Sequence, residues 1–304
     1  MEHVNTPYGS IKSIPSQIEV VNDNVASCVP AEKTTLYTPY GALVPQYSGK
    51  ELRRAESAQI LLHPNGKPRS LPLEDQTIIN TPVGEIPAEL ITFYQNGKLN
   101  RIFPLNGKLS GYWGEEDEAA LAAPLSIPTP LGTITAKILA LSFYKSGNIK
   151  SITLWPEEKI SIPTPVGPIA TRIGVSFHND GKVKSIEPAK PVQISTTLGN
   201  IMAYNPDAVG INGDDNSLEF SEEGEISKVT STLSGIIARK TTGETVRYMP
   251  TERESFCGTT AKEINPLKIF LLKKELRLQS EYSKEIIRLG MDEWTCRTTA
   301  VGLF

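Results

Sequence analysis

The sequence predicts a mainly β protein: a repeated antiparallel β-meander, forming an extended or curved sheet, followed by a C-terminal amphipathic helix. Two recurring turn signals and a period-two apolar pattern between them lead to this prediction. The chain has 304 residues, of which 39% are hydrophobic and 21% charged, and a net charge of −3. This composition suffices for a buried core and argues against a disordered chain.

The first turn signal is the tetrad Thr-Pro-x-Gly. Proline at its second place presets the backbone for a turn, and glycine at its fourth place accommodates the chain that leaves it. Five copies begin at Thr6, Thr38, Thr81, Thr129 and Thr164. A degenerate copy is Thr196-Thr197-Leu198-Gly199, and a weaker one is Thr232-Leu233-Ser234-Gly235.

The second signal is an apolar residue followed four positions later by glycine. It occurs at Leu62 and Gly66, Phe93 and Gly97, Phe143 and Gly147, Phe177 and Gly181, and Phe220 and Gly224. Asn65-Gly66, Asn96-Gly97 and Asp180-Gly181 are typical of tight hairpins in which both central residues need positive φ. The two signals alternate in units of roughly 32–48 residues, a period found in repeat proteins.

The segments between the turns have the pattern of strands. In residues 169–177 the apolar side chains alternate with smaller or polar ones, which predicts a strand with one buried face. Residues 134–143 are more uniformly apolar and indicate a strand covered on both faces. Because turns this short join antiparallel neighbours, residues 1–235 are expected to form one antiparallel β-repeat domain.

Inserts at 41–62, 104–128 and 199–220 interrupt the repeat. In the second insert, four acids from Glu115 to Glu118 precede an alanine-rich stretch, which predicts a short helix near 115–123. Residues 236–304 are expected to be a separate C-terminal segment. Its apolar residues at helical spacing, with Asn265, Pro266 and Gly290 as cap signals, predict a capping or docking helix over 266–289.

Charge and cysteine content narrow the possible environments and partners. The near balance of 31 basic and 34 acidic residues gives no basic patch for nucleic acid. The three cysteines, Cys28, Cys257 and Cys296, have neither disulfide nor metal spacing. No apolar run approaches the length of a membrane span, and no signal peptide is evident at the start, so a cytoplasmic location is expected.

The units Phe93-Tyr94-Gln95-Asn96-Gly97-Lys98 and Phe143-Tyr144-Lys145-Ser146-Gly147 resemble variant MORN-type repeats of bacterial proteins. They also resemble uncharacterised bacterial β-repeat proteins that alternate Thr-Pro-x-Gly with Phe-x-x-x-Gly-Lys. The resemblance covers about residues 60–235, although the dense Tyr-x-Gly-x-Trp pattern and shorter period of typical MORN repeats are missing. It implies an extended antiparallel sheet that serves as a binding or scaffolding surface, and it transfers no catalytic residue.

Motifs for nucleophilic, phosphate-binding or zinc chemistry are missing, so no catalytic residue, metal site or cofactor is predicted. His63 and His178 take the place of Tyr94 and Tyr144 in sister units, which favours a half-exposed ring over a catalytic base. Residues 212–217, with Asp207 upstream, offer oxygen ligands for calcium but lack the EF-hand spacing, and a solvated turn is the favoured interpretation.

A candidate binding site is an aromatic strip. Tyr94, Tyr144 and His178 recur directly after a buried phenylalanine, so neighbouring strands would align them in a row on the opposite face of the sheet. Trp155 lies near a strand end and could extend this row, and Trp113 lies in the longest insert. Such rows hold sugars, peptides or protein surfaces. The alternative, which we favour slightly, is that the second face is covered and the row belongs to the core.

Three functions remain open. The leading one is a non-catalytic binding or scaffold protein that presents its sheet surface to a protein partner, in an unknown oligomeric state. The second is an enzyme of unknown reaction with a site built from the three inserts, with Glu116, Asp207, Asp214 and Asp215 as candidate acids and bases near His178. The third is a carbohydrate-binding module.

Overall fold

The structure is a computed structural model that describes residues 1–49, 53–208, 216–254, 262–280 and 285–301. The chain forms two compact units, each described here by itself. Unit 1 comprises Met1–Trp155 and Asn179–Gly181, and unit 2 comprises Pro156–His178 and Lys182–Phe304. This division falls elsewhere than the boundary expected near residue 235.

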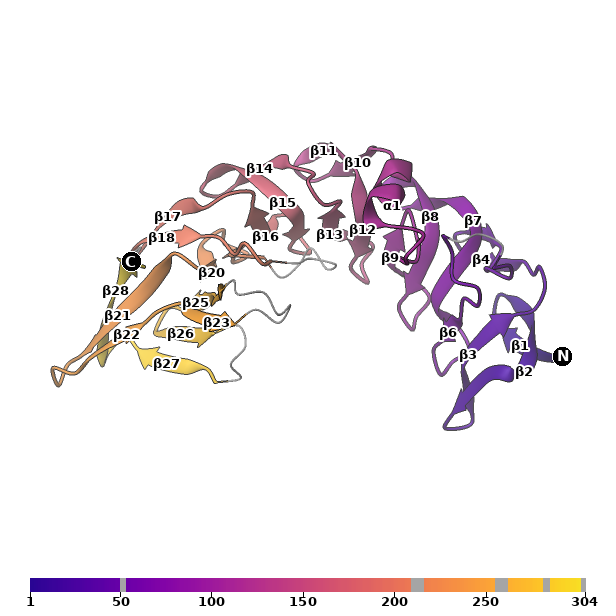
Figure 1. The fold of residues 1–304 in the computed structure, drawn as a ribbon, viewed down its shortest axis with the longest axis horizontal. Helices are drawn as coiled ribbons and strands as arrows, with labels where there is room; N and C mark the ends of the chain where they lie inside the picture. The colour runs from indigo at the N-terminus through magenta and orange to yellow at the C-terminus, as the bar shows by residue number, and fades with distance from the viewer. Residues whose placement is uncertain (50–52, 209–215, 255–261, 281–284, 302–304) are drawn as a thin grey trace. The chain divides into compact units, whose positions relative to one another are not determined.

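Unit 1 is built on an antiparallel meander in which each strand pairs with the next (Figure 1). In spatial order its strands are β1 (Glu2–Thr6), β2 (Gly9–Val21), β3 (Asn24–Pro30), β6 (Ile60–Leu62), β7 (Pro68–Thr81), β8 (Gly84–Phe93), β9 (Leu99–Phe103), β12 (Ile138–Phe143) and β13 (Ile149–Leu154). Separate hairpins are β4 (Leu36–Thr38) with β5 (Gly41–Leu43), and β10 (Leu125–Thr129) with β11 (Gly132–Ala136).

Unit 2 repeats this plan. Its meander runs through β14 (Ile160–Thr164), β15 (Gly167–Phe177), β16 (Val183–Pro188), β19 (Leu218–Phe220), β20 (Ile226–Ser231), β25 (Leu267–Leu271), β26 (Glu275–Ser280) and β27 (Ile287–Gly290). Separate hairpins are β17 (Val192–Thr196) with β18 (Gly199–Ala203), and β23 (Thr251–Glu254) with β24 (Lys262–Asn265). A small sheet joins β22 (Thr245–Tyr248), β21 (Ser234–Lys240) and β28 (Trp294–Ala300). The predicted fold class, a mainly β antiparallel meander, is therefore confirmed.

Each Thr-Pro-x-Gly turn closes a hairpin, which we call a tetrad hairpin, and the threonine side chain holds the turn. In all six copies, counting Thr196 to Gly199, the hydroxyl donates to the glycine carbonyl at 2.6–2.9 Å. The same oxygen accepts the backbone N–H two residues on, at 3.1–3.3 Å. The six glycines have φ between +105° and +144°, where a side chain would be strained.

The second turn signal also closes hairpins, which we call glycine hairpins, but with a geometry different from the predicted one. In these loops only the glycines, from Gly66 to Gly224, have positive φ, because among the described non-glycine residues positive φ is confined to Asn22, Asp23, Glu157 and Ile173. The expectation that Asn65, Asn96 and Asp180 also have positive φ is wrong. The loops are longer and end in a bulge, so one left-handed residue suffices.

The tetrad hairpins fold back over one face of each central sheet. The tip of one such hairpin, Pro82, reaches the glycine hairpin at Gly147, which lies at the other end of the strands. The hairpins bury paired apolar residues two positions before the threonine and two after the glycine, as in Ile79 opposite Ile86 and Ile194 opposite Ile201. The central sheets contribute large fully buried side chains, among them Phe143, Phe177 and Phe220. The core therefore lies between a row of hairpins and a sheet.

The predicted C-terminal helix over 266–289 is wrong. Its described residues form β25, β26 and β27, and β25 pairs with β20. Leu267 and Ile269 are buried on one strand, and Leu276 and Leu278 on the next, which is a period-two pattern within each short strand. The helical spacing arose because the pattern was counted across three separate strands. Pairing with the open edge at β20 satisfies the backbone of these residues, and that non-local partner is not visible in a local pattern.

The single helix of the described residues is α1 (Glu115–Leu121), at the place where the acidic run predicts one. Asp117 accepts a hydrogen bond from the Gly114 backbone N–H at 2.8 Å. Acids in the first turn also favour the helix electrostatically. Within the described residues, no helix combines the length and apolar character needed to cross a membrane.

Replacing Gly84 by alanine should lower the free energy of unfolding by about 1–2 kcal/mol, because alanine is strained at its φ of +107°. An added Cβ would contact nothing within 4 Å, so sterics do not contribute. Gly111→Ala is the matched control, since Gly111 has equal space and no positive φ. Urea denaturation of both variants measures the difference. Equal stabilities would contradict the assigned turn geometry.

Candidate functional site

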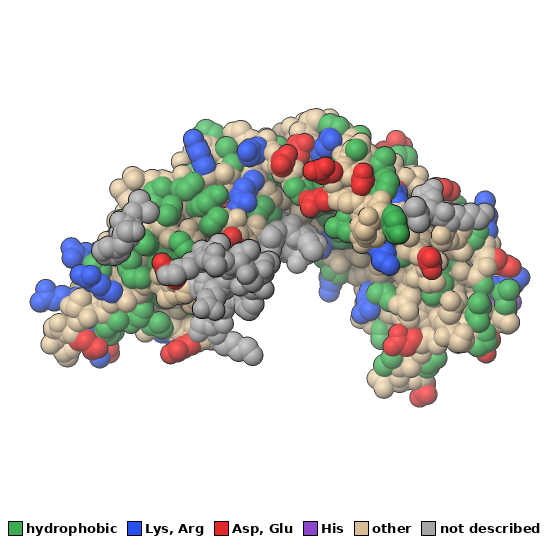
Figure 2. Space-filling model, in the orientation of Figure 1, with side chains coloured by type: hydrophobic (Ala, Val, Ile, Leu, Met, Phe, Trp, Pro, Cys, Tyr) green, Lys and Arg blue, Asp and Glu red, His purple; other side chains and the backbone are tan. Residues whose placement is uncertain are grey.

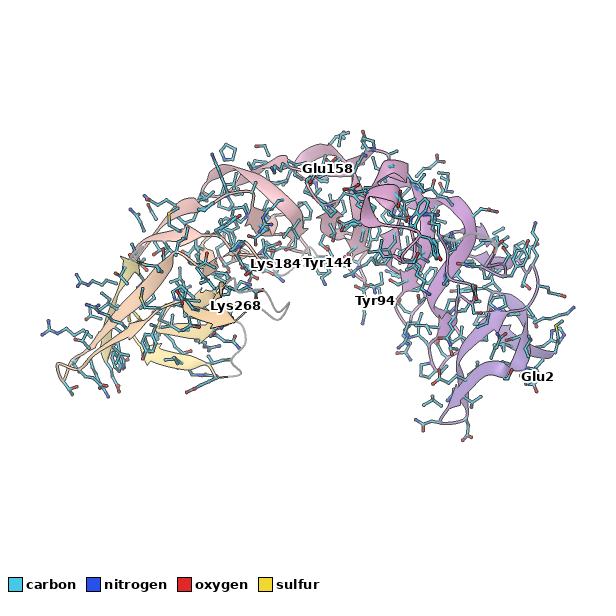
Figure 3. The ribbon with its side chains drawn as sticks, in the orientation of Figure 1. Glu2, Tyr94, Tyr144, Glu158, Lys184 and Lys268 are labelled. Carbon is cyan, nitrogen blue, oxygen red and sulfur yellow. The ribbon has the colours of Figure 1, made fainter. Side chains whose placement is uncertain are left out.

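The rings of the expected aromatic strip lie at the glycine hairpins, as Figure 3 shows for Tyr94 and Tyr144. Tyr94, Tyr144 and His178 are all half-buried. The Tyr94 hydroxyl donates to the carbonyl of Phe143 at 2.8 Å. His63 Nε2 lies 2.9 Å from the Phe93 carbonyl, and His178 Nε2 lies 2.9 Å from the Phe220 carbonyl. Each of these rings therefore ties its hairpin to the next one.

The face opposite the buried phenylalanines carries short hydroxyl side chains instead of rings. Ser142 pairs with Ser151 across β12 and β13, and Ser176 with Ser185 across β15 and β16. Arg101 Nε donates to the Ser142 hydroxyl at 3.0 Å. These strands therefore do not present the row of rings that an exposed aromatic strip requires.

The two tryptophans differ in their surroundings. Trp155 is only 6% exposed and belongs to the core, so its expected part in an exposed strip is wrong. It follows β13 directly, and its backbone N–H donates to Lys137, which holds it against the sheet. Trp113 is half-buried in the 104–128 insert, and its indole N–H donates to Glu118 at 2.7 Å. Trp113 is thus part of a polar cluster.

A buried ionic cluster joins two of the inserts in unit 1. Arg53 donates to Glu118 at 2.7 and 2.9 Å and to Glu89 at 2.6 and 2.9 Å. The backbone N–H groups of Asn106 and Gly107 donate to the same carboxylates at 2.7 and 2.8 Å. Arg53, Glu89 and Glu118 are each at most 8% exposed. Arg53 thereby links the 41–62 insert to α1 and to β8.

The charges of this cluster stabilise one another. Burial alone would raise the pKa of Glu118, but hydrogen bonds from Arg53, Trp113 and Gly107 outweigh it and lower that pKa. Burial alone would lower the pKa of Arg53, and its bonds to Glu118 and Glu89 instead raise it. Arg53 and Glu118 are therefore both charged at neutral pH. A carboxylate held in this way is a poor proton donor or acceptor, so the cluster fixes loops.

Glu89 occupies a repeated position that the turn signals alone did not reveal. Eight residues after the tetrad threonine, five of the six copies carry a polar side chain: Gln46, Glu89, Lys137, Arg172 and Tyr204. Four of these residues bind the loops around them, through Gln46 to Ala55, Glu89 to Arg53, Lys137 to Ala119 and Arg172 to Asn205. A constant offset from the tetrad was the signal in the sequence. We call these residues the anchor positions.

The anchor at Arg172 belongs to a second buried cluster, in unit 2. Arg172 Nη2 lies 3.9 Å from Glu187, which is fully buried and accepts the Ser217 N–H at 2.8 Å. Burial raises the pKa of Glu187, and hydrogen bonds from Ser217 and the charge of Arg172 only partly oppose this. The neighbouring Ile173 has a φ of +63°, which is strained for a β-branched residue and marks the bulge after Arg172.

The two described acids considered for catalysis belong to different units. Glu116 is exposed on α1 of unit 1, whereas Asp207 is exposed in unit 2. Asp214, Asp215 and most of the acidic loop at 212–217 lie outside the described residues. The described part of the chain contains no group of three His, Cys, Asp or Glu side chains able to hold a metal ion.

The described cysteines are likewise unsuited to nucleophilic chemistry. Cys28 and Cys296 are buried free thiols, and Cys257 lies outside the described residues. Burial raises the pKa of Cys28 to about 11. A thiol that stays protonated at neutral pH is a weak nucleophile.

The surface above the unit 1 cluster is the strongest candidate for recognition. Leu109, Tyr112 and Leu121 are 60%, 82% and 51% exposed. Tyr112 projects from a tight turn closed by pairing of Ser110 with Trp113. The Lys108 N–H donates to the Arg53 carbonyl at 2.7 Å, and Glu118 accepts a hydrogen bond from the Trp113 indole N–H. We call these three apolar residues the insert surface.

Comparison of the chain with protein-family models, with curated proteins and with solved structures finds no match. The assignment of a function therefore rests on the geometry of these sites alone.

Tyr94→Phe should lower the free energy of unfolding by about 1 kcal/mol, because it removes the bond to the Phe143 carbonyl and retains the ring. Chemical denaturation measures this change. The control is Tyr37→Phe, at a tyrosine that is 74% exposed and has no hydrogen bond of its hydroxyl among those described. Unchanged stability in Tyr94→Phe would argue that the hydroxyl serves a ligand and not the array.

Arg53→Met should lower the free energy of unfolding by about 3–5 kcal/mol, because Glu118 would remain buried without its counter-charge and Glu89 would keep only Arg54, at 3.6 Å. The control is Lys12→Met, which breaks an exposed pair with Glu32 and should cost about 0.5 kcal/mol or less. Urea unfolding curves of both variants provide the measurement. Similar losses in the two would show that the cluster is not essential to the fold.

Proposed function

We propose that the protein is a non-catalytic binding or scaffold protein whose insert surface in unit 1 contacts a protein partner. The observation that supports this most strongly is the high exposure of Leu109, Tyr112 and Leu121 above a fully bonded ionic cluster. Exposed large apolar side chains on a fixed loop favour association, because little conformational entropy is lost when a partner covers them.

The charges around the insert surface favour a particular kind of partner. Glu115, Glu116 and Asp117 are exposed in the first turn of α1, beside the apolar residues. Figure 2 shows acidic side chains gathered around the position of α1. A complementary partner would place an apolar contact at Tyr112 and a basic rim opposite these acids.

The other two functions lack a comparable observation. A carbohydrate platform requires exposed parallel rings, whereas Tyr94 and His178 bind neighbouring carbonyls and Trp155 is buried. An enzymatic site requires convergent groups with an accessible cavity, and the acids of unit 1 are either paired or solvated. A cytoplasmic location and kinship with MORN-type repeats remain predictions.

A photoreactive phenylalanine analogue introduced at Tyr112 should crosslink a discrete partner in cells, because this side chain is 82% exposed, the most of the three residues of the insert surface. The same analogue at Tyr37, which is 74% exposed elsewhere in unit 1, is the matched control. The measurement is the set of crosslinked species seen on a gel.

The companion variant Leu109→Ala/Leu121→Ala should weaken the captured interaction about tenfold or more, given the usual contribution of central apolar contacts. Identical crosslinking at both tyrosines, or none at Tyr112, would contradict the proposal.

A further inference from the structure

Proline rings of the tetrad turns pack directly over glycines of later hairpins. A Cβ added to Gly66 would lie 3.7 Å from Pro7, and one added to Gly147 would lie 3.5 Å from Pro82. The same relation holds for Gly181 with Pro130, at 2.6 Å, and for Gly224 with Pro165, at 3.5 Å. At Gly181 the ring occupies the space that a side chain would need, whereas at the other three hairpins it would lie in ordinary van der Waals contact with an added Cβ.

This packing is broken at the last tetrad turn of unit 2. Thr197 stands where the other turns have proline, and the next hairpin of the central sheet, between β25 and β26, has Lys273 and Lys274 in place of a glycine loop. The turn is instead held by β28, because Thr298 N–H donates to the Leu198 carbonyl at 2.9 Å. A Cβ on Gly199 would lie 2.6 Å from the Thr298 hydroxyl, so the contact is close.

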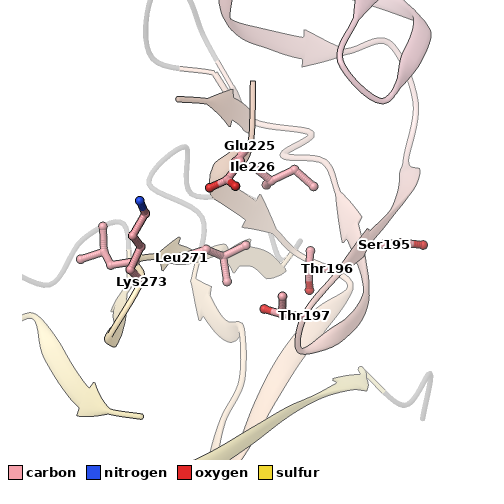
Figure 4. A pocket seen from close by; sticks show the side chains of 8 residues that line it. Ser195, Thr196, Thr197, Glu225, Ile226, Leu271 and Lys273 are labelled. Atoms are coloured by element: carbon pink, nitrogen blue, oxygen red, sulfur yellow. The ribbon is translucent and has the colours of Figure 1, made fainter. Parts of the chain in front are cut away.

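A cavity of about 410 Å³ occupies the place of the missing packing (Figure 4). Its walls come from three hairpins of unit 2: Thr197 from β17 to β18, Glu225 and Ile226 from β19 to β20, and Leu271 and Lys273 from β25 to β26. All five side chains are exposed or half-exposed, so the cavity is accessible. Its volume lies within the range of about 300–1,000 Å³ typical of small-ligand pockets.

We propose that this cavity binds a small prolyl ligand, either free proline or a short peptide with an N-terminal proline. A pyrrolidine ring fills the equivalent place at four other steps of the array, supplied there by the chain itself. Ile226 and Leu271 provide apolar surface for the ring. Glu225 offers a carboxylate for the secondary ammonium, and Lys273 offers an ammonium for the carboxylate of the ligand.

Titration calorimetry of the full chain with Pro-Gly, L-proline and N-acetylprolinamide tests the proposal. Pro-Gly should bind with a dissociation constant of about 1 mM, as expected for a ligand of this size. Lys273→Ala and Glu225→Gln should each weaken binding about tenfold, because each removes one charge-assisted contact. The matched controls Lys274→Ala and Glu222→Gln change the same charges on the same hairpins outside the cavity and should bind normally.

If free proline binds as tightly as Pro-Gly, the site is assigned to the amino acid. If Pro-Gly has the lower dissociation constant, the site is assigned to peptides. Neutral N-acetylprolinamide binding as tightly as either would overturn the charge pairing. No heat from any ligand up to about 20 mM, well above the expected constant, would overturn the proposal as a whole.

Filling the cavity from within provides a second measurement. Thr197→Pro supplies the ring that the sister turns carry, so ligand binding should be lost while the chain stays folded by circular dichroism. Leu272→Trp narrows the same cavity from the β25–β26 hairpin and serves if the first variant does not fold. Retained binding in a folded filling variant would place the ligand elsewhere and overturn the assignment.

Discussion

The structure depends on the return of each tetrad hairpin across the face of its central sheet. A lone meander would leave one face of its phenylalanines in water, and a lone two-stranded hairpin is barely stable. The hairpin contributes buried residues such as the paired Ile79 and Ile86 to the core, and its proline ring contacts a glycine hairpin of the sheet, as Pro82 contacts Gly147. Glycines such as Gly147 therefore combine a positive φ with contact to a ring, and at Gly181 the ring also fills the space of a side chain. This explains why both turn signals recur together.

Polar contacts then fix the spacing between successive glycine hairpins. Tyr94 bonds to the carbonyl of Phe143 and His178 to the carbonyl of Phe220, each one hairpin further along the sheet. The end of each of these phenylalanine strands is therefore held by the preceding hairpin. The anchor positions lie within the same strands, where Glu89 in β8 and Arg172 in β15 each hold an irregular loop. Buried charges are tolerated there because every carboxylate in the unit 1 cluster accepts several hydrogen bonds. Loops of little regular structure thus obtain a defined conformation from the regular part of the fold.

The sequence predicted what is encoded locally and missed what depends on distant partners. Turn signals at Thr81 to Gly84 and at Gly97 act within a few residues, so the meander followed from them. Residues 266–289 were misassigned because the choice between strand and helix was made by pairing with β20, which lies far away in sequence. Arg53 could not be linked to Glu89 and Glu118 without coordinates, since 36 and 65 residues separate them. The sequence left open whether Trp155 lies in an exposed strip or in the core, because nothing local shows how deeply a strand end is covered.

The proposed binding sites both lie where the repeat departs from its own rule, and there is a physical reason for this. Each regular step satisfies its own surface, since proline covers glycine and the rings cover carbonyls, which leaves little for a ligand to contact. At 104–121 an insertion carries apolar residues beyond the last layer that could bury them, and at Thr197 a substitution removes the ring that would close the step. A local departure from an otherwise consistent pattern costs stability, and such departures persist where a function requires them. A ligand or partner that restores the missing contact recovers part of that cost on binding, so the exceptions in this chain are better guides to its function than its repeats.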